Sequence, residues 1–163
     1  FANSAAIGLS PLIGTTVPPQ LKKWLGRFGY LLWAIWWVFR FRPFELILET
    51  EAGRLQMSAL EVRIANGRFH GGVEVVDDAR VDSGEIVVQV VPGRAKHRLV
   101  RNWLAVLVRN RRLKQDTVVD FHAGKLRLVT DPPMPISIDG EVVGHTPARV
   151  EVAQCAIEVV VPY

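Results

Sequence analysis

The sequence is poor in the residues that build disulfides and metal clusters. It holds a single cysteine, Cys155, among 163 residues, which excludes an intrachain disulfide and a thiolate metal cluster. The four histidines are scattered, and none forms the i, i+4 pair with an intervening carboxylate that binds zinc on a helix. Gly-rich phosphate loops and serine-nucleophile motifs are also missing. The chain therefore offers no recognisable nucleotide site, and its low cysteine content fits a reducing compartment.

Long hydrophobic runs are missing as well. The uninterrupted apolar run from Tyr30 to Phe39 covers ten residues, about half of the ~20 that a bilayer span needs. The chain begins at Phe1 without the pattern of a signal peptide, and we expect it to be a fragment. Its 163 residues, 49% of them hydrophobic, fit one folded domain over 1–163.

Acidic residues are absent between Gly93 and Gln115, where eight Lys and Arg residues lie. Such asymmetry indicates an acidic partner, namely a membrane surface, phosphates or nucleic acid, although a solvated helix face is the ordinary alternative. We expect no nucleic-acid partner, because no recognised nucleic-acid fold accompanies the charge and the aromatic residues fall on the apolar face.

The spacing of apolar residues alternates along the chain between the helical period and a period of two. Helical spacing predicts helices over about 20–41 and about 94–109, while a period of two predicts many short strands elsewhere. In the longest predicted strand, 54–65, the apolar residues change face near Ala59–Leu60, which predicts a β-bulge. Short strands separated by turn signals are typical of an antiparallel β-sandwich or barrel, so the predicted fold is mainly β with two helices.

The first predicted helix combines tryptophans with cations. Lys22, Lys23 and Arg27 lie on its amino-terminal half, and Trp33 and Trp37 on its second half. A helix of this composition can lie in the headgroup region of a membrane, where each Lys or Arg adds roughly 1 kcal/mol of attraction to anionic lipid. The alternative is that the tryptophans roof the sandwich core or an acyl-chain pocket.

The order of several short motifs resembles the second domain of bacterial diacylglycerol-kinase and sphingosine-kinase-like lipid kinases. The matching pieces are Asn3 with Gly8, Lys22-Lys23-x-x-Gly26, Asn66-Gly67, Gly71-Gly72, Asp82-Ser83-Gly84, Asp139-Gly140-Glu141 and Thr146-Pro147. Each piece taken alone has an ordinary explanation; Asp139-Gly140, for example, suits a hairpin turn. Together they follow the family's order over nearly the whole chain.

This resemblance implies the second domain of the diacylglycerol kinase and NAD kinase-like fold. In the family, a preceding α/β domain binds ATP and Mg²⁺, and that domain is absent from this chain. The implied reaction transfers the γ-phosphoryl group of ATP to a lipid hydroxyl, with Glu141 as general base and Asp139 beside it. The acceptor, diacylglycerol-like or sphingoid, stays open. We expect the fragment alone to be inactive, and the parent to be a cytoplasmic lipid kinase that associates peripherally with membranes.

The same resemblance concerns a structural magnesium. In the family this metal is held by an Asp-Asp-Gly loop and by neighbouring backbone carbonyls. The loop corresponds here to Asp82-Ser83-Gly84, and the neighbouring carbonyls would be those of Arg80 and Glu85. Ser83 stands where the family has its second Asp, and a neutral hydroxyl is a poorer Mg²⁺ ligand than a carboxylate. The sequence therefore leaves open whether this metal site is kept or lost.

Two other functions stay open. One is a stand-alone, non-catalytic β-sandwich that binds lipid or membrane. The other is a distant relation to the second domain of NAD kinase, which would retain ATP-dependent phosphorylation but change the acceptor. The sequence also leaves open whether the protein forms an oligomer.

Overall fold

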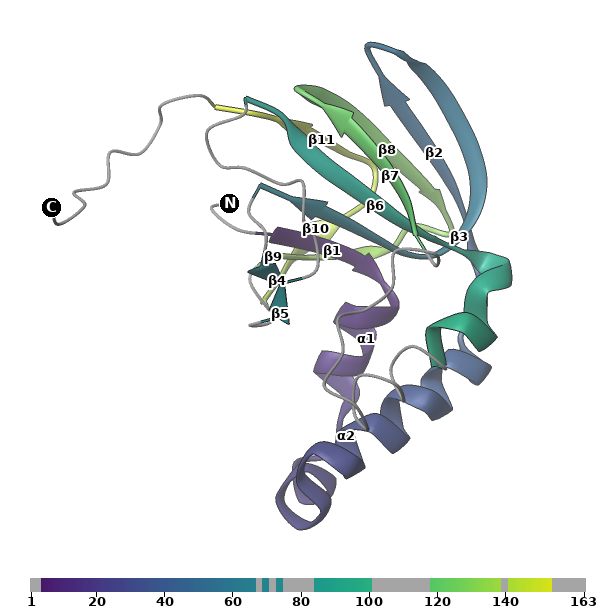
Figure 1. Cartoon of the computed structure of the whole chain (residues 1–163), viewed down its shortest axis with the longest axis vertical. Coiled ribbons are helices and arrows are strands. Elements are labelled where there is room, and N and C mark those ends of the chain that lie inside the picture. Colours follow the sequence, from purple (N-terminus) through teal and green to yellow (C-terminus); the bar gives the residue numbers. More distant parts are fainter. Residues whose placement is uncertain are drawn as a thin grey trace, which may run out of the picture.

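The computed structural model describes residues 4–66, 69–70, 73–74, 84–100, 118–138 and 141–153. These residues form a nine-stranded antiparallel sheet and a two-stranded ribbon, with helices gathered at one end of the sheet (Figure 1). The strands of the large sheet are β1 Ser4–Gly8, β2 Phe44–Thr50, β3 Gly53–Ala65, β6 Ile86–Pro92, β7 Val119–Ala123, β8 Lys125–Asp131, β9 Pro135–Ile138, β10 Glu141–His145 and β11 Ala148–Glu151. The ribbon pairs β4 Phe69–His70 with β5 Val73–Glu74. The predicted mainly β, antiparallel fold is confirmed.

The sheet curls until it is nearly a barrel, because the chain links its two ends. The strand order runs β10-β9-β1-β3-β2-β8-β11, so β10 and β11 stand at opposite ends of that path. Only Thr146 and Pro147 separate His145 of β10 from Ala148 of β11. Three Cα–Cα steps of about 3.8 Å span at most about 11 Å. The joined ends of β10 and β11 therefore lie close together, and this junction is the seam of the sheet.

β3 is the longest strand of the sheet, and it pairs with β1, β2 and β6. Its first half, Gly53–Ala59, pairs with β2, and Glu61–Ala65 pairs with β1. The β6 ladder runs beside its second half and changes register between Ala59 and Glu61. The predicted bulge near Ala59–Leu60 is thus confirmed. It switches the apolar side chains of β3 to a new phase at the point where the sheet bends.

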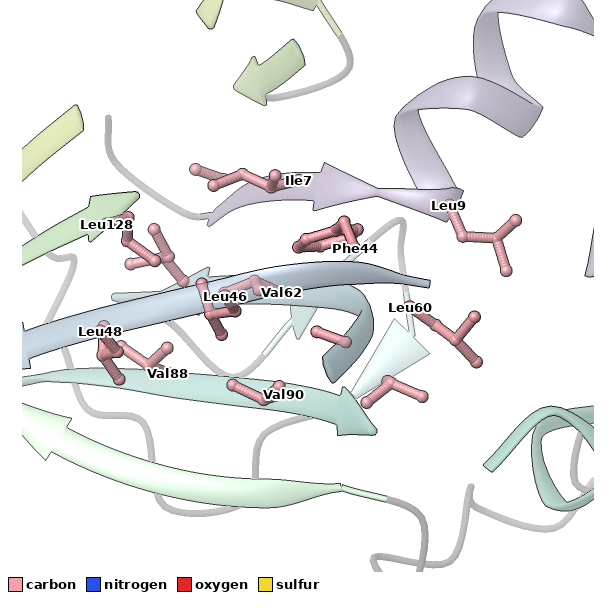
Figure 2. Packing of buried hydrophobic residues seen from close by; sticks show 14 of the residues in the cluster. Ile7, Leu9, Phe44, Leu46, Leu48, Leu60, Val62, Val88, Val90 and Leu128 are labelled. Atoms are coloured by element: carbon pink, nitrogen blue, oxygen red, sulfur yellow. The ribbon is translucent and has the colours of Figure 1, made fainter. Parts of the chain in front are cut away.

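One hydrophobic core fills the interior of the curled sheet. Figure 2 shows side chains from β1, β2, β3, β6 and β8 meeting there, among them Ile7, Leu46, Val62, Val88 and Leu128. Each of these five side chains is fully buried. Because strands bring alternate residues to the same face, each strand supplies its inward set from every second position.

The helices predicted from the spacing of apolar residues are confirmed in part. α2 spans Pro19–Arg40, close to the predicted 20–41, and it bends at Gly26, where φ is 51° and ψ is −126°. The second predicted helix is described only at its start, as the 3₁₀ turn Gly93–Ala95 and the helical residues 96–100. The remainder of 94–109 lies outside the described residues. Lys96 Nζ donates to the Phe41 carbonyl at 2.6 Å, which joins this segment to the carboxy-terminal end of α2.

The helix α1, Leu9–Thr16, was not predicted. Its sequence contains Pro11, Gly14 and two threonines, all of which are poor helix formers in isolation. Tertiary contacts compensate, because Leu9 and Ile13 are buried in the core and the α1 backbone follows directly from β1. The tryptophan indole of Trp33 also donates to Thr16 Oγ1 at 3.2 Å, which fastens α2 onto α1.

Candidate functional site: a carboxylate beside an apolar pocket

Glu141 is the first residue of β10, and its side chain is exposed. It lies directly opposite Ile138 in the antiparallel ladder between β9 and β10. Residues that oppose each other in such a ladder project from the same face of the sheet. Ile138 is half-buried and packs against the core, so Glu141 emerges on the core face, at the edge of the sheet.

An apolar pocket of about 360 Å³ opens on that same face, at the seam between β10 and β11. Its floor is formed by side chains of the curled sheet: Ala5, Ile7, Ile64, Leu128, Ile136 and Ile138. Its rim is formed by the two end strands, through Val143, Gly144, Ala148, Arg149, Val150 and Glu151. Glu141 thus neighbours a pocket wall: Ile138 opposes it, and Val143 follows two residues later on the same strand.

A buried hydrogen-bond network fixes the corner beside this pocket. The hydroxyl groups of Thr130 and Thr146 are hydrogen-bonded to each other. The Met134 amide donates to Thr146 Oγ1 at 2.9 Å, and the Thr146 amide donates to the Met134 carbonyl at 2.9 Å. Thr130 and Thr146 are both buried. The link from β10 to β11 is therefore bound to the link from β8 to β9, which holds the pocket rim in place.

A charged cluster lies on the opposite face of the sheet from the core. Glu61 is fully buried, pairs with Arg63 and accepts a hydrogen bond from Ser10 Oγ at 2.7 Å. Burial, and secondly the Glu61 carboxylate, raise the pKa of Tyr30 on α2. Sequence reasoning missed this cluster, although two charged residues at alternate positions of an apolar strand were a visible signal.

Several predicted site residues lie outside the described part of the chain. These are Asp139, Arg80, Asp82 and Ser83. Of the predicted magnesium loop, only Glu85 is described: it is exposed, and its carboxylate lies 3.9 Å from His122 Nδ1. No group of three His, Cys, Asp or Glu side chains that could hold a metal occurs among the described residues. The magnesium site at this loop therefore stays a prediction.

The aromatic residues of α2 lie in two environments, the edge of the core and the exposed surface. Trp33 and Trp37 are half-buried and pack against the core, as in the roofing alternative. After the bend at Gly26, Phe28, Leu32 and Trp36 follow one another at i, i+4 spacing and are all exposed; Trp24, before the bend, is 85% exposed. Arg40, four residues further, lies over the Trp36 ring at 5.3 Å. The backbone of α2 is described at Lys22, Lys23 and Arg27, whereas their side chains lie outside the described part.

Within the described part of the chain, no helix has the length and apolar composition needed to cross a bilayer.

Comparison with known proteins identifies the family. Residues 7–161 match the family model described as the YegS C-terminal NAD kinase β-sandwich-like domain. The chain belongs to this family. The curated relatives include a protein of Shewanella frigidimarina named as a probable lipid kinase YegS-like and a diacylglycerol kinase of Staphylococcus haemolyticus. Each is 24% identical to this chain, and the alignment covers 99% of this chain. The expected relationship to the second domain of diacylglycerol-kinase-like proteins is confirmed.

Solved structures agree on the fold of this YegS-type domain. A structure described as a putative diacylglycerol kinase from Bacillus anthracis strain Sterne superposes with a TM-score of 0.68 at 17% identity, over 93% of this chain and 49% of that one. The curated relatives show the same proportion, since the chain covers 52% of the Shewanella protein and 49% of the Staphylococcus protein. The chain thus spans about half the length of the proteins it matches.

Proposed function

We propose that this chain forms the acceptor half of an ATP-dependent lipid kinase. The lipid hydroxyl oxygen attacks the γ-phosphorus of ATP, the bond from that phosphorus to the bridging oxygen of ADP breaks, and the hydroxyl proton passes to the Glu141 carboxylate. Asp139 is proposed to lie beside this carboxylate. ATP and Mg²⁺ would bind through an α/β nucleotide-binding half, where the metal neutralises phosphate charge.

The position of Glu141 carries this proposal. A general base for an alcohol must meet the hydroxyl while the rest of the lipid stays out of water. Glu141 is an exposed carboxylate on the core face of the sheet, next to the wall of an apolar pocket. A carboxylate beside a hydrocarbon surface suits an acceptor that has one polar group and an apolar remainder.

The exposed stripe of α2, formed by Phe28, Leu32 and Trp36, is proposed to contact the membrane that supplies the acceptor, together with the exposed Trp24 before the bend. Residues 19–42 contain five Lys and Arg residues and no Asp or Glu. A helix with exposed aromatic residues and only positive charge matches the interface of an anionic bilayer. The enzyme would then reach a lipid hydroxyl at the surface, as a cytoplasmic protein bound peripherally.

The test is a transfer assay with the full-length protein that carries this chain. It is incubated with Mg²⁺ and ATP labelled at the γ-phosphate, and with mixed micelles that contain diacylglycerol, a sphingoid base or no acceptor. Label in an acceptor-dependent lipid phosphate supports the proposal and identifies the acceptor. Binding of the same protein to anionic vesicles without any transfer to lipid would instead favour the non-catalytic membrane-binding function.

A further inference from the structure

The pocket at the seam has the chemistry of a hydrocarbon site. Ten of its twelve lining residues are apolar, counting Gly144. Its volume of about 360 Å³ falls at the lower end of the ~300–1,000 Å³ range of small-molecule pockets. A water molecule in an apolar cavity lacks the two or more hydrogen-bond partners that it needs, so its binding there is unfavourable. An alkyl chain needs no such partners, and its transfer from water into the cavity is favourable. The lining therefore selects hydrocarbon, and the volume favours one chain over two.

Gly144 keeps the mouth of the pocket open. It lies opposite Ile136 in the β9–β10 ladder, so its missing side chain would point to the pocket face. A Cβ atom built at Gly144 meets no other atom within 4 Å. Val143 lies at the register shift in β10. It is 60% exposed and also lines the rim. A larger side chain at Gly144 would therefore project into open space on the pocket face.

The rim carries polar groups on both sides. On β11, Glu151 pairs with Lys125 at 3.1 Å, whereas the exposed side chain of Arg149 forms no ion pair with another described residue. On β10, Glu141 projects from the pocket face two residues before Val143. A molecule with a polar end and one alkyl tail would keep its polar end at this rim while its tail enters between the end strands.

We propose that this seam pocket binds one unbranched alkyl chain of the lipid acceptor, and that Gly144 is the residue that determines which chains can enter. The proposal rests on the proposed lipid kinase function for the identity of the lipid. The pocket itself requires neither ATP nor phosphoryl transfer, so its occupancy can be measured separately. Each methylene that leaves water strengthens binding by roughly fourfold, and affinity should therefore rise with chain length until the pocket is full.

The test measures binding of cis-parinaric acid, whose fluorescence increases when its chain leaves water, to the 163-residue chain. The variant Gly144→Phe places a ring in the mouth. Its matched control, Val142→Phe, adds the same ring on the same strand at an exposed position that opposes Ser137 and faces away from the pocket. Loss of contact with two or more methylenes predicts binding weakened by about tenfold or more in Gly144→Phe. Val142→Phe should stay within about twofold of the unmodified chain.

Further measurements complete the test. A dodecanol and hexadecanol competition series separates the chain from the carboxylate, because an alcohol that displaces the probe shows recognition of hydrocarbon. Ala148→Leu, on the other rim strand, replaces Gly144→Phe if circular dichroism shows that the latter is unfolded. The probe is bound without ATP, so that occupancy of the pocket is measured apart from the catalytic proposal. Absence of saturable binding to the unmodified chain, or equal binding by the folded pocket variants, would overturn the proposal.

Discussion

Glu61 of β3 accepts a hydrogen bond from Ser10 of α1 at 2.7 Å, while the other oxygen of its carboxylate pairs with Arg63 on the same strand. A glutamate with no exposed surface and an arginine that is 8% exposed are stable inside a protein only as partners. The pair joins the base of α1 to the sheet, and it does so at the bulge where the sheet bends.

Removing one member of this pair should be costly. Glu61→Leu leaves the Arg63 guanidinium buried without its carboxylate, and we expect the free energy of unfolding to fall by about 3–5 kcal/mol. Urea denaturation followed by tryptophan fluorescence measures it. The double variant Glu61→Leu/Arg63→Met removes both charges and should recover most of the loss. If the double variant is as unstable as the single one, charge pairing is the wrong explanation.

Thr146→Val should loosen the corner beside the pocket. The change keeps the shape of the side chain but removes the hydrogen bonds that Thr146 Oγ1 makes with the Met134 amide and the Thr130 hydroxyl. Both groups keep a second partner, because the Met134 amide also donates to Thr130 Oγ1 at 3.2 Å and that hydroxyl donates to the Pro132 carbonyl at 2.9 Å. The loss of such hydrogen bonds, with no group left unsatisfied, predicts a fall of about 0.5–1.5 kcal/mol in the free energy of unfolding. Thermal unfolding measures the loss, and Thr50→Val is the control because its hydrogen bond to the Gly53 carbonyl, at 3.4 Å, is exposed. Equal melting temperatures for the two variants would show that the network contributes nothing.

Gly8 is required by the turn from β1 into α1. Its φ of 101° is unfavourable for any residue with a side chain, and a Cβ atom there would lie 2.5 Å from the Leu60 carbonyl oxygen. We expect Gly8→Ala to lower the free energy of unfolding by at least about 2 kcal/mol. Gly144→Ala has open space around its Cβ and should change stability by less than about 0.5 kcal/mol. A stable Gly8→Ala protein would contradict the described turn.

The α2 stripe predicts a membrane-binding phenotype. Phe28 and Leu32 are 64% and 59% exposed, so replacing both with serine should leave folding intact and weaken sedimentation with phosphatidylglycerol vesicles by about tenfold or more. Val119→Ser, on β7, removes a 39% exposed apolar side chain away from α2 and should bind as before. Vesicle binding should also fall as salt rises, because the cations of α2 contribute. Undiminished binding by the α2 variant would exclude the stripe from the membrane contact.

Much of the fold could be predicted from local patterns. The change of phase at Ala59–Leu60 was enough to predict the bulge in β3, because a one-residue shift moves every following side chain to the other face. The helix α2 followed from the helical spacing of its apolar residues. α1 could not be predicted, because its stability comes from the core contacts of Leu9 and Ile13 rather than from its own propensities.

The site required the tertiary structure. Glu141 was selected from a motif, but its position beside a pocket depends on pairing between residues as distant as Ala5 and Ile138. The pocket itself forms only when the ends of the sheet meet at the β10–β11 link, and no local pattern predicts such closure. For the same reason, the burial of Glu61 could not be predicted from residue type, since glutamate is usually exposed.

The central claim is that Glu141 accepts the proton of the lipid hydroxyl, and steady-state kinetics of Glu141→Gln in the full-length protein test it most directly. The amide keeps the size of the side chain but cannot take the proton. We predict that kcat for lipid phosphorylation falls by about 100-fold or more, while the KM for ATP and the melting temperature are unchanged. The control, Glu51→Gln, changes an exposed carboxylate in the turn between β2 and β3 and should retain full turnover. A Glu141→Gln protein that phosphorylates lipid as fast as the unmodified protein would contradict the account.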